Sequence, residues 1–258
     1  MMISLLNALA TVIELIFTVP VAGRLLKWGW SLGLSLISLV AGFFDGILWL
    51  AGVRPEKKLR VGVIVLRDEH GLPLMASSEV PAGIEQAGNT FLNRANVRII
   101  PTWEIEIGTV GQDDAWNADG KWVRINPESG QNSILIVGCN QVAFGEDLGR
   151  AGSEFEFLMA SLNARGNLRR VIGIGAPLIA FIVADINGFL GCSLGPLSDY
   201  VTVKQGHVDC VAHELGHACN LPHSDDAENL MFRRGCTNDE LTVWQVILLR
   251  ASRHVAYI

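Results

Sequence analysis

Three of the six histidines in this 258-residue chain fall within eleven consecutive residues. His213 and His217 are four residues apart, so on a helix their imidazoles point from the same face and can hold one metal ion. Glu214 follows His213 directly, where its carboxylate can reach a water beside the metal rather than the metal itself. The pattern H-E-x-x-H is typical of zinc hydrolases, in which this glutamate is the general base.

A third histidine, His223, comes six residues after His217, too far along the chain to continue the same helical face. The chain must therefore turn sharply for His223 to reach the same ion. Asn220 lies where the turn is needed, and asparagine tolerates the left-handed conformation. Pro222 then opposes further helix. We expect His213, His217 and His223 to bind one catalytic Zn²⁺ and to leave its fourth position to water.

The segment HELGHACNLPHS, residues 213–224, resembles the zinc helix of the metzincin peptidases, and among them the matrixin-like (matrix metalloproteinase type) catalytic domains. Met231 lies just downstream, where this family has its Met-containing turn, and Asp226 stands at the spacing of a family aspartate. Asn220 replaces the usual glycine, and Phe232 stands where many relatives have tyrosine. Upstream of this segment, the chain fits the family only in the coarse order of its elements.

The resemblance implies a zinc endopeptidase that hydrolyses protein or peptide substrates with Glu214 as general base. It also implies that Met231 packs as a floor beneath the zinc. Asp226 and Asn220 would then support the ligands from behind, although a solvated loop aspartate is an equally good interpretation of Asp226.

The upstream pattern predicts an α+β fold, a metzincin-like (zincin) domain with a mixed, mainly parallel sheet and an active-site helix. A strand, a helix with Pro81 in its first turn and a second strand suggest a right-handed crossover. The predicted strands are Val61–Leu66, Val97–Ile100, Ser133–Val137, Leu178–Ala184 and Tyr200–Val203. The predicted helices are Ile84–Asn93, a segment within Ser153–Arg170 that ends near Gly166, the zinc helix from near Gly206, and a last helix opened by a capping box at Thr237–Glu240.

The first 53 residues are strongly apolar and contain only four charged side chains: Glu14, Arg24, Lys27 and Asp45. Met1–Val21 and Trp28–Val53 are each long enough to cross a hydrocarbon core of roughly 30 Å. We therefore expect a membrane-anchoring helical hairpin at 1–53 that contacts lipid, a linker at 54–60 and a metallopeptidase domain at 61–258. An interfacial anchor, a signal peptide and a buried helix remain alternatives, because Glu14 and Asp45 are costly in lipid.

The side of the membrane on which the catalytic domain lies stays open. Arg54, Lys57, Lys58 and Arg60 outnumber the two cations before the second apolar run, which favours the cytoplasm, whereas the mostly secreted family favours the other side. Five cysteines leave at least one unpaired. Cys219 and Cys236 flank the metal motif and are either bridged or two buried thiols.

The net charge and one acidic loop bear on two further ligands, nucleic acid and Ca²⁺. The net charge of −6 argues against a nucleic-acid partner. Asp113, Asp114 and Asp119 lie in a polar stretch that matches no strong Ca²⁺-loop template, so we interpret it as a solvated loop rather than a structural calcium site.

Two rival functions remain. One is a gluzincin-type peptidase in which Glu240 replaces His223 as the third ligand, although the predicted capping box gives Glu240 another role. The other is a non-catalytic membrane scaffold with a vestigial zinc site. Glu214 argues against the scaffold, because a purely structural zinc site has no use for a base beside its ligands.

Overall fold

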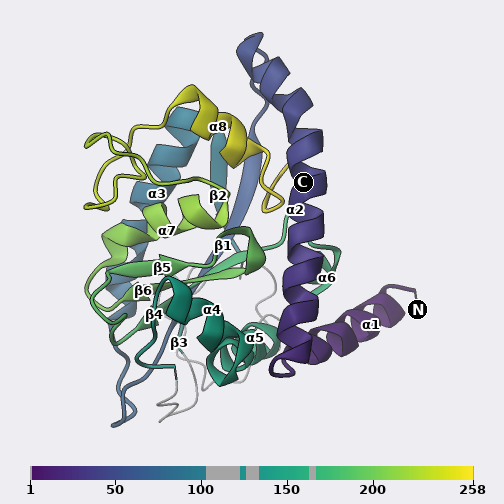
Figure 1. Ribbon diagram of the computed structural model, residues 1–258, viewed down its shortest axis with the longest axis vertical. Coiled ribbons are helices and arrows are strands. Elements are labelled where there is room, and N and C mark those ends of the chain that lie inside the picture. The colour runs from purple at the N-terminus through teal and green to yellow at the C-terminus, as the bar shows by residue number, and fades with distance from the viewer. Residues whose placement is uncertain (1, 103–122, 126–133, 163–166, 258) are drawn as a thin grey trace.

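The computed structural model describes residues 2–102, 123–125, 134–162 and 167–257, and it is built around one sheet (Figure 1). The strand order is β2-β1-β4-β6-β5, with β3 and β7 also paired to β1. All these pairings are parallel except β1 with β7 and β6 with β5. The strands are β1 Lys57–Val65, β2 Val97–Pro101, β3 Val123–Ile125, β4 Leu178–Val183, β5 Gly191–Ser193, β6 Tyr200–Lys204 and β7 Val255–Ala256. The prediction of a mixed, mainly parallel sheet is confirmed.

Helices precede the sheet and cover it. They are α1 Met2–Phe17, α2 Ala22–Leu50, α3 Val80–Ala95, α4 Gln141–Leu148, α5 Arg150–Leu162, α6 Asn167–Ile172, α7 Val211–Ala218 and α8 Val243–Arg250. Short 3₁₀ turns are η1 Ser77–Glu79, η2 Gly195–Leu197 and η3 Val208–Cys210. Pro81 lies in the first turn of α3, as predicted, and Asn96 ends that helix in the left-handed conformation.

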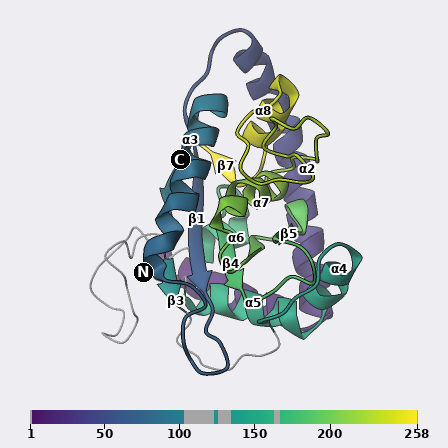
Figure 2. The same cartoon turned by 90° about the vertical axis from the view of Figure 1, so that its left-hand side faces the viewer.

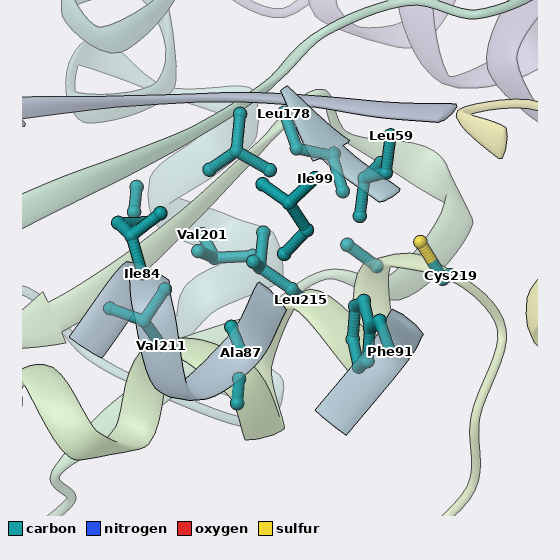
Figure 3. Packing of buried hydrophobic residues seen from close by; sticks show 14 of the residues in the cluster. Leu59, Ile84, Ala87, Phe91, Ile99, Leu178, Val201, Val211, Leu215 and Cys219 are labelled. Atoms are coloured by element: carbon teal, nitrogen blue, oxygen red, sulfur yellow. The ribbon is translucent and has the colours of Figure 1, made fainter. Parts of the chain in front are cut away.

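The main core lies between the sheet and the helices α3 and α7. Figure 3 shows strand residues such as Leu59, Ile99 and Val201 meeting Phe91 of α3 and Leu215 of α7. The central strands β4 and β6 are buried on both faces, as expected of parallel strands. This packing holds α7, which carries the first two histidines of the motif, against the sheet. Figure 2 shows α7 beside α3.

A second core covers the other face of the sheet. Phe155, Leu158 and Met159 of α5 pack against Ile179 and Phe181 of β4, with Phe155 and Phe181 ring centroids 4.6 Å apart. The expected helix within Ser153–Arg170 is in fact two helices, α5 and α6, and residues 163–166 lie outside the described part of the chain.

The N-terminal helices are fastened to this domain by buried ion pairs. Arg24 reaches Asp147 at 2.7 Å and Glu156 at 2.6 Å, and Lys27 pairs with Asp199. Glu14 of α1 pairs with Arg170 of α6 at 2.9 Å. At the far end of α2, Asp45 pairs with Arg250 of α8 at 2.8 Å.

These contacts correct the picture of a membrane hairpin in which Arg24 and Lys27 lie in the connecting loop. Both cations lie on α2 and are buried in the domain. Within the described residues, α2 is the one helix long and apolar enough to cross a membrane; α1 has only 16 residues. Figure 1 shows α1 leaving the base of α2 at a wide angle rather than running back beside it. Two-pass anchoring therefore has no structural support, and the count of cations for sidedness no longer applies.

Three predicted elements have different bounds or extent in the structure. The strand β1 begins at Lys57, inside the expected linker 54–60, since its register with β2 starts there. The zinc helix begins with η3 at Val208 rather than near Gly206. The described part of the expected strand Ser133–Val137 makes only an isolated bridge, between Ile136 and Asp185.

The capping box predicted at Thr237–Glu240 is wrong. The last helix, α8, is capped by Thr242, whose hydroxyl accepts from Gln245 N while the Gln245 side chain accepts from Thr242 N. Glu240 instead pairs through its backbone with the segment before Met231, because Leu230 N donates to Glu240 O at 2.8 Å. Thr237–Glu240 and Thr242–Gln245 both match the capping-box pattern, and only the tertiary fold determines which of them caps the helix.

The division into an anchor of residues 1–53 and a separate domain of residues 61–258 stays a prediction, and the buried pairs supply a test. We expect Arg24→Met to lower the free energy of unfolding by about 3–5 kcal/mol, because the buried carboxylates of Asp147 and Glu156 lose the cation that they share. Leu25→Met, at the next and exposed position, should change it by less than about 0.5 kcal/mol. Denaturant unfolding of both variants measures the difference. Equal stability of the two variants would mean that the helix is an independent appendage.

Candidate metal centre and active-site cleft

Helix α7 presents one face to the core and another to an open cleft. Val211, Ala212 and Leu215 are buried against the sheet and α3, as their spacing predicts. His213 and His217 lie one turn apart on the cleft side, with ring centroids 4.8 Å apart. The buried face therefore sets the direction in which the two imidazoles point.

The turn predicted at Asn220 is present and brings in the third histidine. Asn220 has φ of 74°, in the left-handed region, and Leu221 N donates to Gly216 O at 3.0 Å to close the helix. His223 Nε2 then lies 3.1 Å from His217 Nε2. The candidate ligand atoms of His213, His217 and His223 all lie within 4.8 Å of one another, so this group can hold a metal ion.

Hydrogen bonds orient two of the three imidazoles. His213 Nδ1 lies 2.8 Å from Leu230 O, and His217 Nδ1 lies 2.8 Å from Leu221 O. A carbonyl oxygen only accepts, so each Nδ1 carries the proton and each Nε2 keeps a free lone pair. Burial lowers the pKa of His217 to about 4 and also lowers the pKa of His213. Both rings are therefore neutral at pH 7, the form that binds a metal, and this donor set fits a zinc ion.

Met231 forms the floor of the site. It is fully buried, and a Cβ built on Gly216 of α7 would come within 2.6 Å of its Sδ, so the loop packs directly against α7. Met231 N donates to Asn229 Oδ1 at 2.9 Å, and the Asn229 side chain is held by Gln245 of α8. Sequence reasoning missed the supporting pair Asn229 and Gln245, because they are distant along the chain and belong to no motif.

Glu214 lies beside the ligands in a confined place. Its side chain is 5% exposed and lines the cleft, and burial raises its pKa to about 8. Gly191 of β5 lies against it, so close that an added Cβ would be 2.5 Å from Glu214 Oε1. The role of Gly191 was also missed, although a glycine within a strand is a signal of close approach.

The cleft in front of these groups has a volume of ≈ 670 Å³. Its walls come from the loop before α4, the edge strand β5, the turn η2 and the segment after Met231. The lining includes Phe144, Phe189, Leu190, Pro196, Phe232 and Arg233 beside the three histidines and Glu214. The site is thus an open, partly apolar groove and not an enclosed cavity.

Two disulfides stabilise the rim of this cleft. Cys139 pairs with Cys192 of β5, and Cys210 at the start of the zinc helix pairs with Cys236 beyond the Met turn. The suggested Cys219–Cys236 bridge is therefore wrong, because Cys219 points into the core and is free and buried. One unpaired thiol was expected from the odd count.

Other predicted residues lie away from the ligands. Asp226 is exposed and stabilises its own turn, where its Oδ1 accepts a hydrogen bond from Glu228 N at 3.1 Å. The Glu240 carboxylate pairs with Arg94 of α3. His70, His207 and His254 are outside the ligand group found among the described residues. The calcium-loop residues Asp113, Asp114 and Asp119 lie outside the described part of the chain.

The conformation of Asn220 predicts which substitutions the site tolerates. Asn220→Gly should keep metal affinity and stability, since glycine adopts positive φ freely and Asn220 Nδ2 has no partner to lose. Asn220→Val should cost about 1–2 kcal/mol of stability and weaken metal binding, because a β-branched residue is strained there. Thermal unfolding and metal titration measure both. Equal behaviour of glycine and valine would show that the left-handed turn does not position His223.

Comparison with known proteins adds nothing to this geometry. No protein-family model matches the chain, and no curated protein sequence matches it significantly. The function must therefore be inferred from the arrangement of the residues themselves.

Proposed function

We propose that this protein is a zinc-dependent endopeptidase with a metzincin-like, matrixin-like catalytic domain. The observation that carries the proposal is the convergence of three histidine side chains within 4.8 Å of one another beside the buried carboxylate of Glu214, in an open cleft. A structural zinc site is normally closed by four protein ligands, whereas three histidines and an accessible face are typical of a hydrolytic site.

The chemistry is divided between the ion and the protein. When bound, zinc supplies a Lewis acid that acidifies a water and polarises a carbonyl oxygen. Glu214 takes the proton of the attacking water and passes it to the leaving amine. Its burial favours this exchange, since a raised pKa lets the carboxylate hold a proton between the two steps. Met231 exchanges no proton and keeps the ligand helix in place.

The position of β5 suggests how a peptide would lie. This short strand ends the sheet and is bonded on one side only to β6, so among the described strands its other edge is unpaired. The residues of β5 also line the cleft beside Glu214. An extended peptide can add to a free strand edge through backbone hydrogen bonds, which bind without regard to side-chain sequence. Phe189, Leu190 and Phe232 then offer apolar surface to its side chains.

The two disulfides favour an oxidising compartment as the location of the cleft, because such bonds are rare where thiols are kept reduced. This replaces the weak preference for the cytoplasm that came from counting cations, two of which are buried in ion pairs. The apolar N-terminal helix keeps the protein at a membrane.

The gluzincin alternative is weakened by the position of Glu240, whose carboxylate is paired with Arg94. The scaffold alternative leaves the buried Glu214 without a role. Neither alternative is favoured by a specific observation, and one set of variants separates all three.

Metal analysis and proteolysis of the full chain test the proposal. We expect about one zinc per chain and cleavage of an unfolded protein that a chelator abolishes. Glu214→Gln should retain zinc and lose cleavage by about 10²–10⁴-fold, because only the base is removed. His223→Ala should lose zinc, and Glu240→Gln should keep both zinc and activity.

Each outcome has a clear meaning. Zinc retained by His223→Ala and lost by Glu240→Gln would transfer the assignment to the gluzincin alternative. Full activity in Glu214→Gln would remove Glu214 from the mechanism. Zinc-loaded wild type that cleaves no peptide in a random mixture would favour the scaffold.

A further inference from the structure

Helix α2 buries its charged side chains and exposes apolar ones, the reverse of an ordinary amphipathic helix on a soluble protein. Its buried stripe contains every charged residue of the helix, Arg24, Lys27 and Asp45, together with Ser31 and Ser35. Every residue of the helix that is exposed is apolar. These exposed residues are Ala22, Leu25, Leu26, Gly29, Trp30, Leu32, Gly33, Leu36, Ile37, Val40, Ala41, Phe43, Phe44, Ile47, Leu48 and Leu50.

Helix α1 has a similar pattern, with Thr11 as the one exposed polar residue among those of its residues whose burial is described. Glu14 is 1% exposed and paired with Arg170, while Leu6, Leu9, Val12, Leu15 and Ile16 are exposed. We call the exposed apolar residues of α1 and α2 the outer face. A contiguous exposed apolar patch of this extent is uncommon on a soluble monomer and marks a binding surface.

The contacts of α2 with the domain exclude an orientation in which this helix crosses the membrane while the domain stays on one side of the bilayer. Arg24 and Asp45 are 21 residues apart, which corresponds to about 32 Å along a helix, close to the thickness of the hydrocarbon core. Both side chains are ion-paired to the same folded domain, Arg24 to Asp147 and Asp45 to Arg250. The turn before α2 also touches the domain, since Val21 N donates to Leu148 O at 2.7 Å. A spanning α2 would carry the polar domain into the bilayer with it.

We propose that the outer face lies flat in one leaflet of a lipid bilayer, so that α1 and α2 form a monotopic membrane-binding surface and no segment of them spans. The domain then rests on one side of the membrane, with its charges turned away from the lipid. This inference stands whether or not the protein is a peptidase.

The chemistry of the outer face selects hydrocarbon over a protein partner. Protein interfaces carry about one hydrogen bond per 100–200 Å² and a polar rim. Among the exposed side chains of α2, the one polar group is the Trp30 indole, and its Nε1 already donates to Val171 O at 2.8 Å. A surface that offers no other side-chain donor or acceptor over the length of a 29-residue helix suits acyl chains, which need neither.

Depth measurements along α2 test the orientation. Single cysteines replace Leu26, Ile37 or Leu48, all exposed on the outer face, in the otherwise unchanged full chain. A fluorescent or spin label can be attached selectively, because Cys219 is buried with its pKa raised to about 12 and the other cysteines are paired. In phosphatidylcholine vesicles, all three labels should report the same shallow depth in one leaflet.

A spanning helix would place the label at Ile37 near the bilayer centre and the labels at Leu26 and Leu48 near opposite surfaces, and that result would overturn the proposal. Labels that stay out of contact with lipid while the protein forms a dimer would also overturn it, by assigning the outer face to a second copy. These outcomes are distinct from loss of zinc or of cleavage.

Vesicle flotation supplies a second test with a matched control. Ile37→Glu combined with Phe44→Glu should weaken binding by about tenfold or more, because charge is placed in hydrocarbon. Leu72→Glu, at an exposed position in the loop between β1 and α3, should bind like wild type. Raising salt to about 0.5 M should leave wild-type binding unchanged, since the outer face carries no charge to screen.

Retained binding by the double variant, or loss of wild-type binding in salt, contradicts the proposal. Near-ultraviolet circular dichroism checks that both glutamate variants keep the native fold, which is expected because the substituted side chains are exposed. The labelling experiment decides the matter independently if the double variant unfolds.

Discussion

The candidate metal site depends on one constraint, the return of the chain from the end of α7 to the underside of the same helix. That return supplies three things at once. It brings His223 to His217, it provides the carbonyls of Leu221 and Leu230 that orient the other two rings, and it places Met231 beneath Gly216. Since the carbonyls of Leu230 and Leu221 accept from Nδ1 of His213 and His217, the backbone of the loop leaves Nε2 of each ring free to bind a metal. One returning segment therefore supplies both the third histidine and the support of the other two, and Asn220, in the left-handed conformation, makes its turn.

The loop itself is stabilised from outside by groups that no motif predicts. Asn229 and Gln245 exchange two side-chain hydrogen bonds, and Asn229 also accepts from Met231 N. The Cys210–Cys236 bridge closes the segment that begins before α7 and ends after the Met turn. A ligand on a loop is held within coordinating distance only if the residues around it are fixed, so these contacts supply the preorganisation that the proposed metal site would require.

The sequence was sufficient where chemistry and spacing are local. The interval of four residues between His213 and His217, the conformational tolerance of Asn220 and the Val- and Ile-rich runs of β1 and β4 each depend on a short stretch of chain. It was insufficient where charge must find a distant partner. Arg24 and Lys27 looked like loop cations because they interrupt two apolar runs, yet their partners Asp147 and Asp199 lie more than a hundred residues away. The strand expected at Ser133–Val137 and the capping box expected at Thr237–Glu240 differ for another reason, because tertiary contacts override the local sequence pattern there.

The buried charges explain why a helix as apolar as α2 is still part of the domain. Removing an ion from water costs several kcal/mol unless a partner compensates, so each charged residue of α2 specifies where the helix must dock. The turn η2 makes contact with both α2 and α7, and its residues Gly195 and Pro196 line the cleft. One side of α2 thus supports a wall of the cleft, while the opposite side presents apolar side chains. Because all charged residues of α2 are buried against the domain, this single helix joins the cleft beside the three histidines to an uncharged, apolar surface.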